Sequence, residues 1–194
     1  MERRKHLRLP GYDYSAEGAY FVTIVCHDRR PYFGKVVDKE MVLGPIGIAA
    51  DNCWKELPHH FNNVRIDVHQ VMPEHFHGIL FLDDVKRVSG ILTIDSGIVQ
   101  LNNATDLKQN ATDSNQNATD QSMFFSRISP KKGTLGVIIR TFKAAVTTWC
   151  RSNGYPEFGW QSLYYDRIIR NNEELDRIRQ YIRMNPQNYH KKAQ

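Results

Sequence analysis

The chain has 194 residues, a length that suits one domain with a hydrophobic core of its own. Hydrophobic residues make up 41% and charged residues 24%, as in ordinary folded proteins. No apolar run approaches the ~20 residues of a membrane helix, and the basic start (Met1–His6) leads into Arg8-Leu9-Pro10-Gly11 instead of the apolar stretch of a signal peptide. We therefore expect a cytoplasmic protein, and the net charge of +5 weakly favours an anionic partner such as nucleic acid.

The first half of the chain predicts strands and one helix. Alternating or β-branched runs indicate strands, and a broad apolar face at helical spacing indicates the helix. In chain order we expect a strand over 19–28, a strand or turn pair through 33–43, a helix over 46–57, and neighbouring antiparallel strands over 64–72 and 75–82.

Residues 86–130 differ from the rest in composition. Asn-Ala-Thr-Asp occurs at 103–106, 110–113 and 117–120, a seven-residue repeat without the apolar positions of a coiled coil. Such polar residues bury too little surface to offset the entropy of ordering. We expect a flexible insertion within one domain that spans 1–194.

Regular structure is expected again from Thr134. This residue is a plausible N-cap for a helix that extends to about Arg151. An extended aromatic stretch follows over 158–169. A last helix should begin near Asn171 or Asn172, with acidic residues in its first turn, and end before Pro186.

The three cysteines are far apart in the sequence. Cys26, Cys53 and Cys150 include no C-x-x-C pair, so neither a disulfide nor a cysteine-based zinc site is expected. We interpret each as a buried free thiol.

The pattern His75-Phe76-His77 lies within a predicted strand. Side chains two apart leave the same face of a strand, so both imidazoles can reach one metal ion. The alternative is a pair of structural or surface histidines, which the spacing alone slightly favours.

Tyr181 and Asn185 are four residues apart on the last helix, so they share one face. A phenol beside a metal can attack a phosphodiester, although it needs a nearby cation to ionise at neutral pH. Asn185 could offer an oxygen to the same metal. Tyr181 also continues an apolar stripe, and periodicity alone favours a core position.

Other polar residues are weaker candidates. His59, His60 and His69 are expected to be capping, solvated or structural. Tyr164 and Tyr165 are expected to pack in a strand or at its end, with either as the alternative nucleophile. Basic residues that could contact DNA phosphates, although solvation alone would explain them, are Arg3, Arg4, Lys5, Lys131, Lys132, Arg140 and Lys143.

Several segments together resemble one family. The run 71–80 (VMPEHFHGIL) resembles the His-hydrophobic-His (HUH) segment of transposases that use one catalytic tyrosine, and 18–24 (GAYFVTI) resembles their first strand. Residues 160–186 resemble the tail of the REP-associated tyrosine transposases. The resemblance covers nearly the whole chain outside 86–130. Arg167 departs from the family, where histidine is frequent.

The resemblance implies an α+β fold with a ferredoxin-like core, in which a central antiparallel sheet is flanked by helices and a central strand has the HUH motif. It implies Mg²⁺ or Mn²⁺ bound by His75, His77 and Asn185, with Tyr181 as the nucleophile. The expected activity is cleavage and rejoining of single-stranded DNA at hairpins through a 5′-phosphotyrosine. Such an enzyme would be associated with the nucleoid, as a monomer or a homodimer.

Three alternatives stay open. A replication initiator or relaxase would use the same chemistry, but usually has additional domains. A ferredoxin-like nucleic-acid-binding protein without catalysis is possible, although the aromatic pattern of an RNA-recognition motif is not evident. An inactive, domesticated transposase would keep the same residues.

Overall fold

A four-stranded antiparallel sheet forms the centre of the computed structural model, which describes residues 13–14, 16–83 and 133–189. The spatial order of its strands is β4-β5-β1-β6. Their bounds are Gly18–Val25 (β1), Val64–Val71 (β4), His75–Leu82 (β5) and Tyr165–Ile169 (β6). Along the chain, one helical segment lies between β1 and β4, β5 follows β4 directly, and a second helical segment lies between β5 and β6. This order gives the predicted ferredoxin-like α+β fold.

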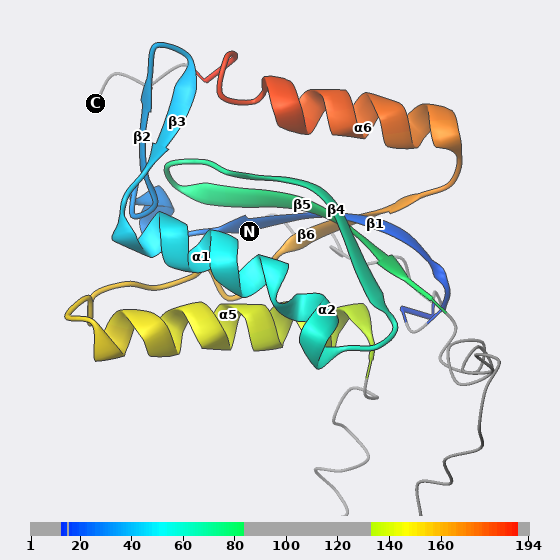
Figure 1. Ribbon diagram of the computed structural model, residues 1–194, viewed down its shortest axis with the longest axis horizontal. Helices are drawn as coiled ribbons and strands as arrows, with labels where there is room; N and C mark the ends of the chain where they lie inside the picture. Colours follow the sequence, from blue (N-terminus) through cyan, green and yellow to red (C-terminus); the bar gives the residue numbers. More distant parts are fainter. Residues whose placement is uncertain (1–12, 15, 84–132, 190–194) are drawn as a thin grey trace, which may run out of the picture.

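Helices cover both faces of the sheet (Figure 1). On one face lie α1 (Pro45–Lys55), the short α2 (Leu57–His60) and the long α5 (Leu135–Ser152), whereas α6 (Asn172–Met184) crosses the other face. A two-stranded hairpin, β2 (Gly34–Val37) and β3 (Glu40–Leu43), stands beside the sheet, and a 3₁₀ turn (η1, His27–Arg29) follows β1. None of the described helices is both long and apolar enough to cross a membrane.

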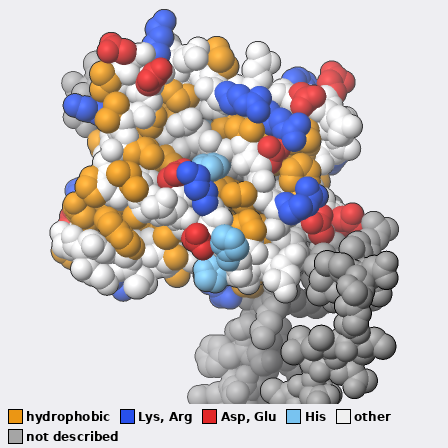
Figure 2. All heavy atoms as spheres, viewed as in Figure 1, with side chains coloured by type: hydrophobic (Ala, Val, Ile, Leu, Met, Phe, Trp, Pro, Cys, Tyr) orange, Lys and Arg blue, Asp and Glu red, His pale blue; other side chains and the backbone are white. Residues whose placement is uncertain are grey.

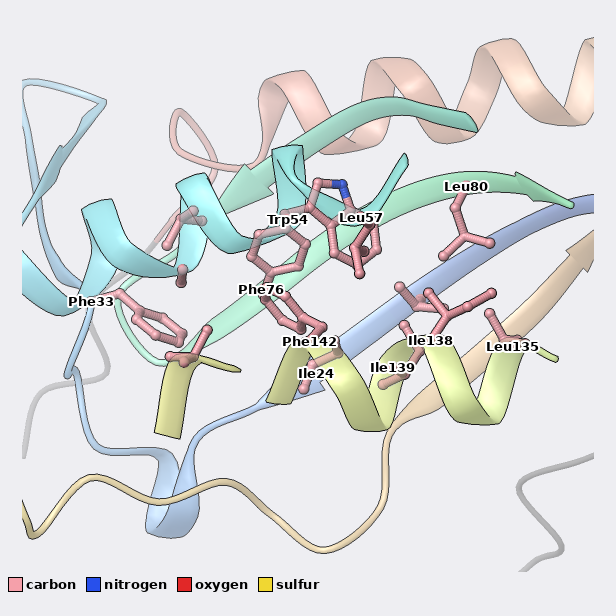
Figure 3. Packing of buried hydrophobic residues seen from close by; sticks show 14 of the residues in the cluster. Ile24, Phe33, Trp54, Leu57, Phe76, Leu80, Leu135, Ile138, Ile139 and Phe142 are labelled. Carbon is pink, nitrogen blue, oxygen red and sulfur yellow. The ribbon is translucent and has the colours of Figure 1, made fainter. Parts of the chain in front are cut away.

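The larger hydrophobic core fills the space between the sheet and the helices α1 and α5 (Figure 3). At its centre the indole of Trp54 lies 4.7 Å from the ring of Phe76 and 5.3 Å from that of Phe142, measured between centroids. Gly78 is on the same face of β5, and a Cβ atom there would come within 2.5 Å of the Trp54 ring. The absent side chain of Gly78 therefore leaves the space that the indole occupies.

A smaller core lies between the sheet and α6. It contains Ile79 from β5, Ile169 from β6, and Leu175 and Ile182 from α6. Leu175 and Ile182 are seven residues apart, so they share one face of the helix. Each face of the sheet thus has an apolar region, and the region under α6 is the smaller one.

A β-bulge interrupts the pairing of β4 with β5. Ile66 pairs with Leu80, but the next aligned pair is His69 with Gly78, so β4 has one extra residue there. Val68 consequently packs in the small core under α6, whereas Ile66 belongs to the large core.

The predicted elements match the structure closely, with two differences. The helix expected over 46–57 is divided, because Pro58 cannot donate the hydrogen bond that would continue α1. The strand expected over 19–28 ends at Val25, since Asp28 and Arg29 turn away with positive φ angles of 51° and 52°. The three cysteines are free; Cys26 and Cys150 are buried as expected, whereas Cys53 is only half-buried.

Asn63 joins the two described ends that flank the segment 84–132. Its backbone carbonyl accepts a hydrogen bond from the Asp83 amide at 2.8 Å, and its side-chain amide donates to the Gly133 carbonyl at 3.2 Å. The expected insertion at 86–130 lies outside the described residues.

Candidate active site

The two histidines of the HUH motif lie on the α6 side of the sheet. His75 and His77 alternate on β5 with Phe76 and Gly78, which face the large core. The imidazole centroids of His75 and His77 are 4.5 Å apart, with their planes at 72°. The strand therefore brings the two rings together on one face, as the spacing predicted.

Each imidazole has a hydrogen-bonding partner at its Nδ1 atom. Nδ1 of His75 lies 3.2 Å from Oε1 of Glu74, and Nδ1 of His77 lies 2.9 Å from the hydroxyl oxygen of Thr23, its aligned neighbour on β1. A carboxylate only accepts, so Nδ1 of His75 donates its hydrogen to Glu74, and in the neutral ring Nε2 then has the lone pair. The Thr23 hydroxyl can either accept from or donate to Nδ1 of His77; where it accepts, Nε2 of the neutral His77 ring has the lone pair.

Burial keeps the His77 imidazole neutral. Its residue is only 4% exposed, and burial followed by the charge of nearby His75 lowers the pKa of His77 to about 3. Burial alone would raise the pKa of the Glu74 carboxyl, but hydrogen bonds led by that from His75 outweigh burial and lower the pKa. At neutral pH the site thus combines the neutral imidazole of His77 with the ionised carboxylate of Glu74.

Tyr181 reaches this histidine pair from α6. Its hydroxyl lies 3.5 Å from Nε2 of His77, a long contact for a hydrogen bond. Its ring meets the ring of Phe21 on β1 edge-on, with centroids 6.1 Å apart. Tyr181 is nevertheless 52% exposed, so the expectation of a core position from periodicity is wrong. The side chain therefore packs against the sheet on one side and faces solvent on the other.

Two polar contacts attach α6 to the sheet. The Arg179 guanidinium donates from Nε to Oδ2 of Asp67 in the β4 bulge at 2.7 Å. At the start of the helix, Asn171 caps the Glu174 amide at 2.8 Å, and the Glu174 carboxylate accepts from Nε of Arg167 at 2.7 Å. These contacts define where Tyr181 lies over β5. Arg167, the departure from the family pattern, thus has a structural partner.

The end of α6 also lies near the histidine strand. Asn185 is the C-cap residue, one turn beyond Tyr181, and is half-buried. Tyr189 follows, and its hydroxyl donates to Oε2 of Glu74 at 3.0 Å. In the sequence, Asn185 therefore lies between Tyr181, which contacts His77, and Tyr189, which contacts Glu74 just before β5.

The donor set suits a divalent metal ion. Neutral imidazoles bind first-row divalent ions, and hydrogen-bonded Nδ1 atoms of this kind orient ligating histidines. Within the described ranges, no group of three or more His, Cys, Asp or Glu side chains is arranged to hold a metal. The two imidazoles would therefore need an amide oxygen, water or a substrate phosphate to complete the coordination.

The weaker histidine candidates lie elsewhere. His69 faces α1 and its Nε2 lies 2.7 Å from Oδ1 of Asp51. His59 and His60 are exposed at the end of α2, with Nδ1 of His59 2.9 Å from Oε2 of Glu56. All three agree with the structural or solvated roles expected from the sequence.

Tyr165 shares the sheet face of the histidines without adjoining them. It pairs with Thr23 on β1, which in turn pairs with His77 on β5. Adjacent strands are about 4.8 Å apart, so roughly 10 Å separates the backbones of Tyr165 and His77.

Of the basic residues proposed as DNA contacts, the structure describes only Arg140 and Lys143, and neither lies beside the histidine pair. Arg140 is exposed on α5, on the opposite face of the sheet. Lys143 is half-buried and donates to the Gln161 carbonyl at 2.6 Å. Figure 2 shows Lys and Arg side chains in separate groups with acidic ones among them. Outside the described residues lie Arg3, Arg4, Lys5, Lys131 and Lys132.

Sequence reasoning missed four residues at this site, namely Phe21, Thr23, Glu74 and Tyr189. An acidic residue directly before the histidine pair is a signal that could have indicated Glu74. Thr23 follows only from the register of β1 with β5. Nothing local to Tyr189 suggests a contact 115 residues away.

This chain belongs to the same family as a protein of Haemophilus influenzae. The Haemophilus protein, which is uncharacterized, is 34% identical over 189 residues, which cover 96% of this chain and 89% of that protein. No protein-family model matches the sequence.

Two solved structures are similar to this chain. One is a REP-associated tyrosine transposase bound to a REP hairpin, with a TM-score of 0.51 and 16% identity over 96% of this chain and 73% of the other. Another is a candidate transposase of Deinococcus radiodurans, with a TM-score of 0.42 and 11% identity over 91% and 95% of the two chains. The first similarity shows a shared fold.

Proposed function

We propose that this chain cleaves and rejoins single-stranded DNA. The support comes from the fold that it shares with a tyrosine transposase and from the geometry of the site. Tyr181 would be the nucleophile, and His75, His77 and Asn185 would hold Mg²⁺ or Mn²⁺. The observation that carries the proposal is that the hydroxyl of the half-exposed Tyr181 lies 3.5 Å from Nε2 of His77. A phosphate that approaches from solvent and an ion bound by this imidazole could therefore both reach the hydroxyl oxygen.

The proposed cleavage is a transesterification. The Tyr181 hydroxyl oxygen forms a bond to phosphorus and releases its proton to solvent, while the bond from phosphorus to the 3′ oxygen breaks. That oxygen takes up a proton, which leaves a 3′-hydroxyl on one DNA end and a 5′-phosphotyrosine on the other. A 3′-hydroxyl can later attack the phosphotyrosine and restore the phenol, so rejoining needs no ATP.

The described side chains have separate roles in this proposal. A bound divalent ion would supply Lewis-acid polarisation of the phosphate. Glu74 would orient the imidazole of His75, and Thr23 that of His77. The ring of Phe21 packs against the ring of Tyr181 on the sheet side. Because Tyr181 is half exposed, a phosphate of an unpaired strand can approach it without any rearrangement of the core.

The substrate is proposed from the solved structure that shares the fold. That transposase is bound to a REP hairpin, so we propose a hairpin next to unpaired DNA as the substrate. In single-stranded DNA the backbone can bend into the site and the bases are free to stack on aromatic side chains.

The test uses the full chain with hairpin-bearing single-stranded DNA, labelled on each side of the hairpin in turn, and Mn²⁺ or Mg²⁺. We expect a denaturant-resistant adduct on the 5′ phosphate, absent with EDTA, in Tyr181→Phe and in His75→Ala. Tyr165→Phe is the matched control and should form the adduct. Hairpin binding without any adduct in the unmodified protein would instead favour a binding protein without catalysis, or an inactive transposase.

A further inference from the structure

Both oxygens of the Glu74 carboxylate are engaged. Oε1 lies 3.2 Å from Nδ1 of His75, and Oε2 accepts a hydrogen bond from the Tyr189 hydroxyl at 3.0 Å. The exposed fractions of the His75 and Glu74 side chains are only 14% and 16%. The three groups form a continuous chain of hydrogen bonds from the C-terminal segment to the histidine pair.

Tyr189 is built into the structure directly after α6. Its backbone amide donates to the Pro186 carbonyl at 3.3 Å, and the Asn188 amide donates to the Met184 carbonyl at 3.1 Å. This turn brings the tyrosine back toward β5, and the ring is half-buried. Burial, followed by the hydrogen bond to Glu74, raises the pKa of Tyr189 to about 12. The hydroxyl therefore remains a hydrogen-bond donor at neutral pH.

We propose that Tyr189 is a positioning residue for the metal site, which acts by fixing the rotation of the Glu74 carboxylate and, through it, the orientation of the His75 ring. The inference rests on the proposed function, because it concerns the same pair of histidines. A carboxylate with one free oxygen can rotate about its last bond. With Oε2 bound by Tyr189, Oε1 stays directed at Nδ1 of His75.

The arrangement also connects two parts of the site that are distant in the sequence. The segment that ends in Tyr189 begins with the helix that presents Tyr181, whereas Glu74 directly precedes the histidines of β5. A shift of the segment after α6 would therefore alter the orientation of His75. Partners of a ligating histidine of this kind commonly change metal affinity by roughly 10–100-fold when they are removed.

The test measures Mn²⁺ binding by the full chain without DNA, from the electron paramagnetic resonance signal of free Mn²⁺. We expect Tyr189→Phe, which keeps the ring and removes the hydroxyl, to weaken binding by about tenfold, and Glu74→Ala to weaken it by roughly 10–100-fold. Tyr32→Phe is the control, because the Tyr32 hydroxyl donates a comparable hydrogen bond, at 2.8 Å, to the Glu157 carbonyl. It should bind Mn²⁺ as the unmodified protein does.

A double variant separates positioning from general packing. If Tyr189 acts only through Glu74, then Tyr189→Phe should cause no further loss of Mn²⁺ affinity in the Glu74→Ala background. A further tenfold loss there would overturn the positioning role. Thermal unfolding of each variant shows whether the fold is intact.

The outcomes also distinguish this inference from the proposed function. Unchanged Mn²⁺ affinity in Tyr189→Phe, together with a loss in His75→Ala, would reject the role of Tyr189 and leave the metal site standing. Absence of Mn²⁺ binding by the unmodified protein, both alone and with hairpin DNA whose phosphate could complete the coordination, would reject both.

Discussion

Arg179 on α6 and Asp67 on β4 form an ion pair in which Nε and Nη2 of the guanidinium both lie 2.7 Å from one carboxylate oxygen. Arg179 leaves the helix on the flank facing β4, and Tyr181 leaves it toward Phe21 on β1. Residues two apart on a helix differ by about 200° in direction. The ion pair, together with the apolar contacts of Leu175 and Ile182, therefore holds α6 in one rotation about its axis and so helps to place the Tyr181 hydroxyl.

Replacement of Arg179 should therefore affect activity more than stability. Arg179→Lys keeps the charge but loses the planar two-nitrogen contact. Because the pair is partly exposed, we expect a loss of about 1 kcal/mol or less in the free energy of unfolding. Displacement of the nucleophile should lower the rate of adduct formation by about ten- to a hundredfold. Single-turnover kinetics and urea unfolding measure the two effects, with the exposed Arg177→Lys as the control; equal rates in the two variants would contradict the argument.

Gly78 should tolerate no side chain while Trp54 is present. An added Cβ atom would come within 2.5 Å of the Trp54 ring and 3.0 Å of that of Phe76. We expect Gly78→Ala to lower the free energy of unfolding by about 1–3 kcal/mol, as overpacking of a core does. Urea unfolding measures the loss. In a Trp54→Phe background the added methyl group should cost less, and an equal cost would show that the indole is not the obstacle.

Asp51 should make stability depend on pH in the acid range. Burial alone would raise the pKa of Asp51, but its hydrogen bonds with Lys55 and His69, led by Lys55, outweigh burial and lower the pKa below 3.8. A carboxyl whose pKa is lower in the folded than in the unfolded state stabilises the fold above the unfolded value, and this contribution disappears as the pH falls through the folded value.

The comparison is urea unfolding of the unmodified protein and of Asp51→Asn between pH 7 and pH 2.5. We expect a difference of roughly 1 kcal/mol at pH 5–7 that shrinks below about pH 3.8. A difference that stays constant over the whole range would mean that the carboxylate charge makes no contribution.

Tyr165 should be dispensable as a nucleophile. It lies two strands from His77, whereas the Tyr181 hydroxyl is 3.5 Å from the imidazole. We expect Tyr165→Phe to form the covalent DNA adduct at nearly the rate of the unmodified protein. Peptide mapping of the adduct should identify Tyr181; a phosphotyrosine at Tyr165 would require a different assignment of the nucleophile.

The sequence predicts the elements well because their signals are local. The alternation in β5 places His75 and His77 on one face, and Thr134 caps α5 as expected, with its hydroxyl oxygen accepting from the Val137 amide. The bulge in β4 is different, because strict alternation would put Ile66 and Val68 on the same face. The extra residue separates them, and it directs Asp67 toward Arg179.

The exposure of Tyr181 could not be predicted from periodicity. The apolar stripe of α6 includes Leu175, Ile178 and Ile182, and Tyr181 lies at its edge. Whether an edge position is buried depends on how far the helix rotates over the sheet. The contacts that hold this rotation include an ion pair between residues 112 positions apart, which a single sequence does not indicate.

The two hydrogen bonds of Asn63 have a consequence for how the length of this chain can vary. Asn63 binds both Asp83, just after β5, and Gly133, just before α5. The connection between these two residues therefore needs to span only a short distance. The entropic cost of connecting two fixed ends rises by only about 0.6 kcal/mol for each doubling of the connection's length. We therefore expect that residues can be added or removed between Asp83 and Gly133 while the sheet, the histidine pair and the tyrosine helix keep the same geometry.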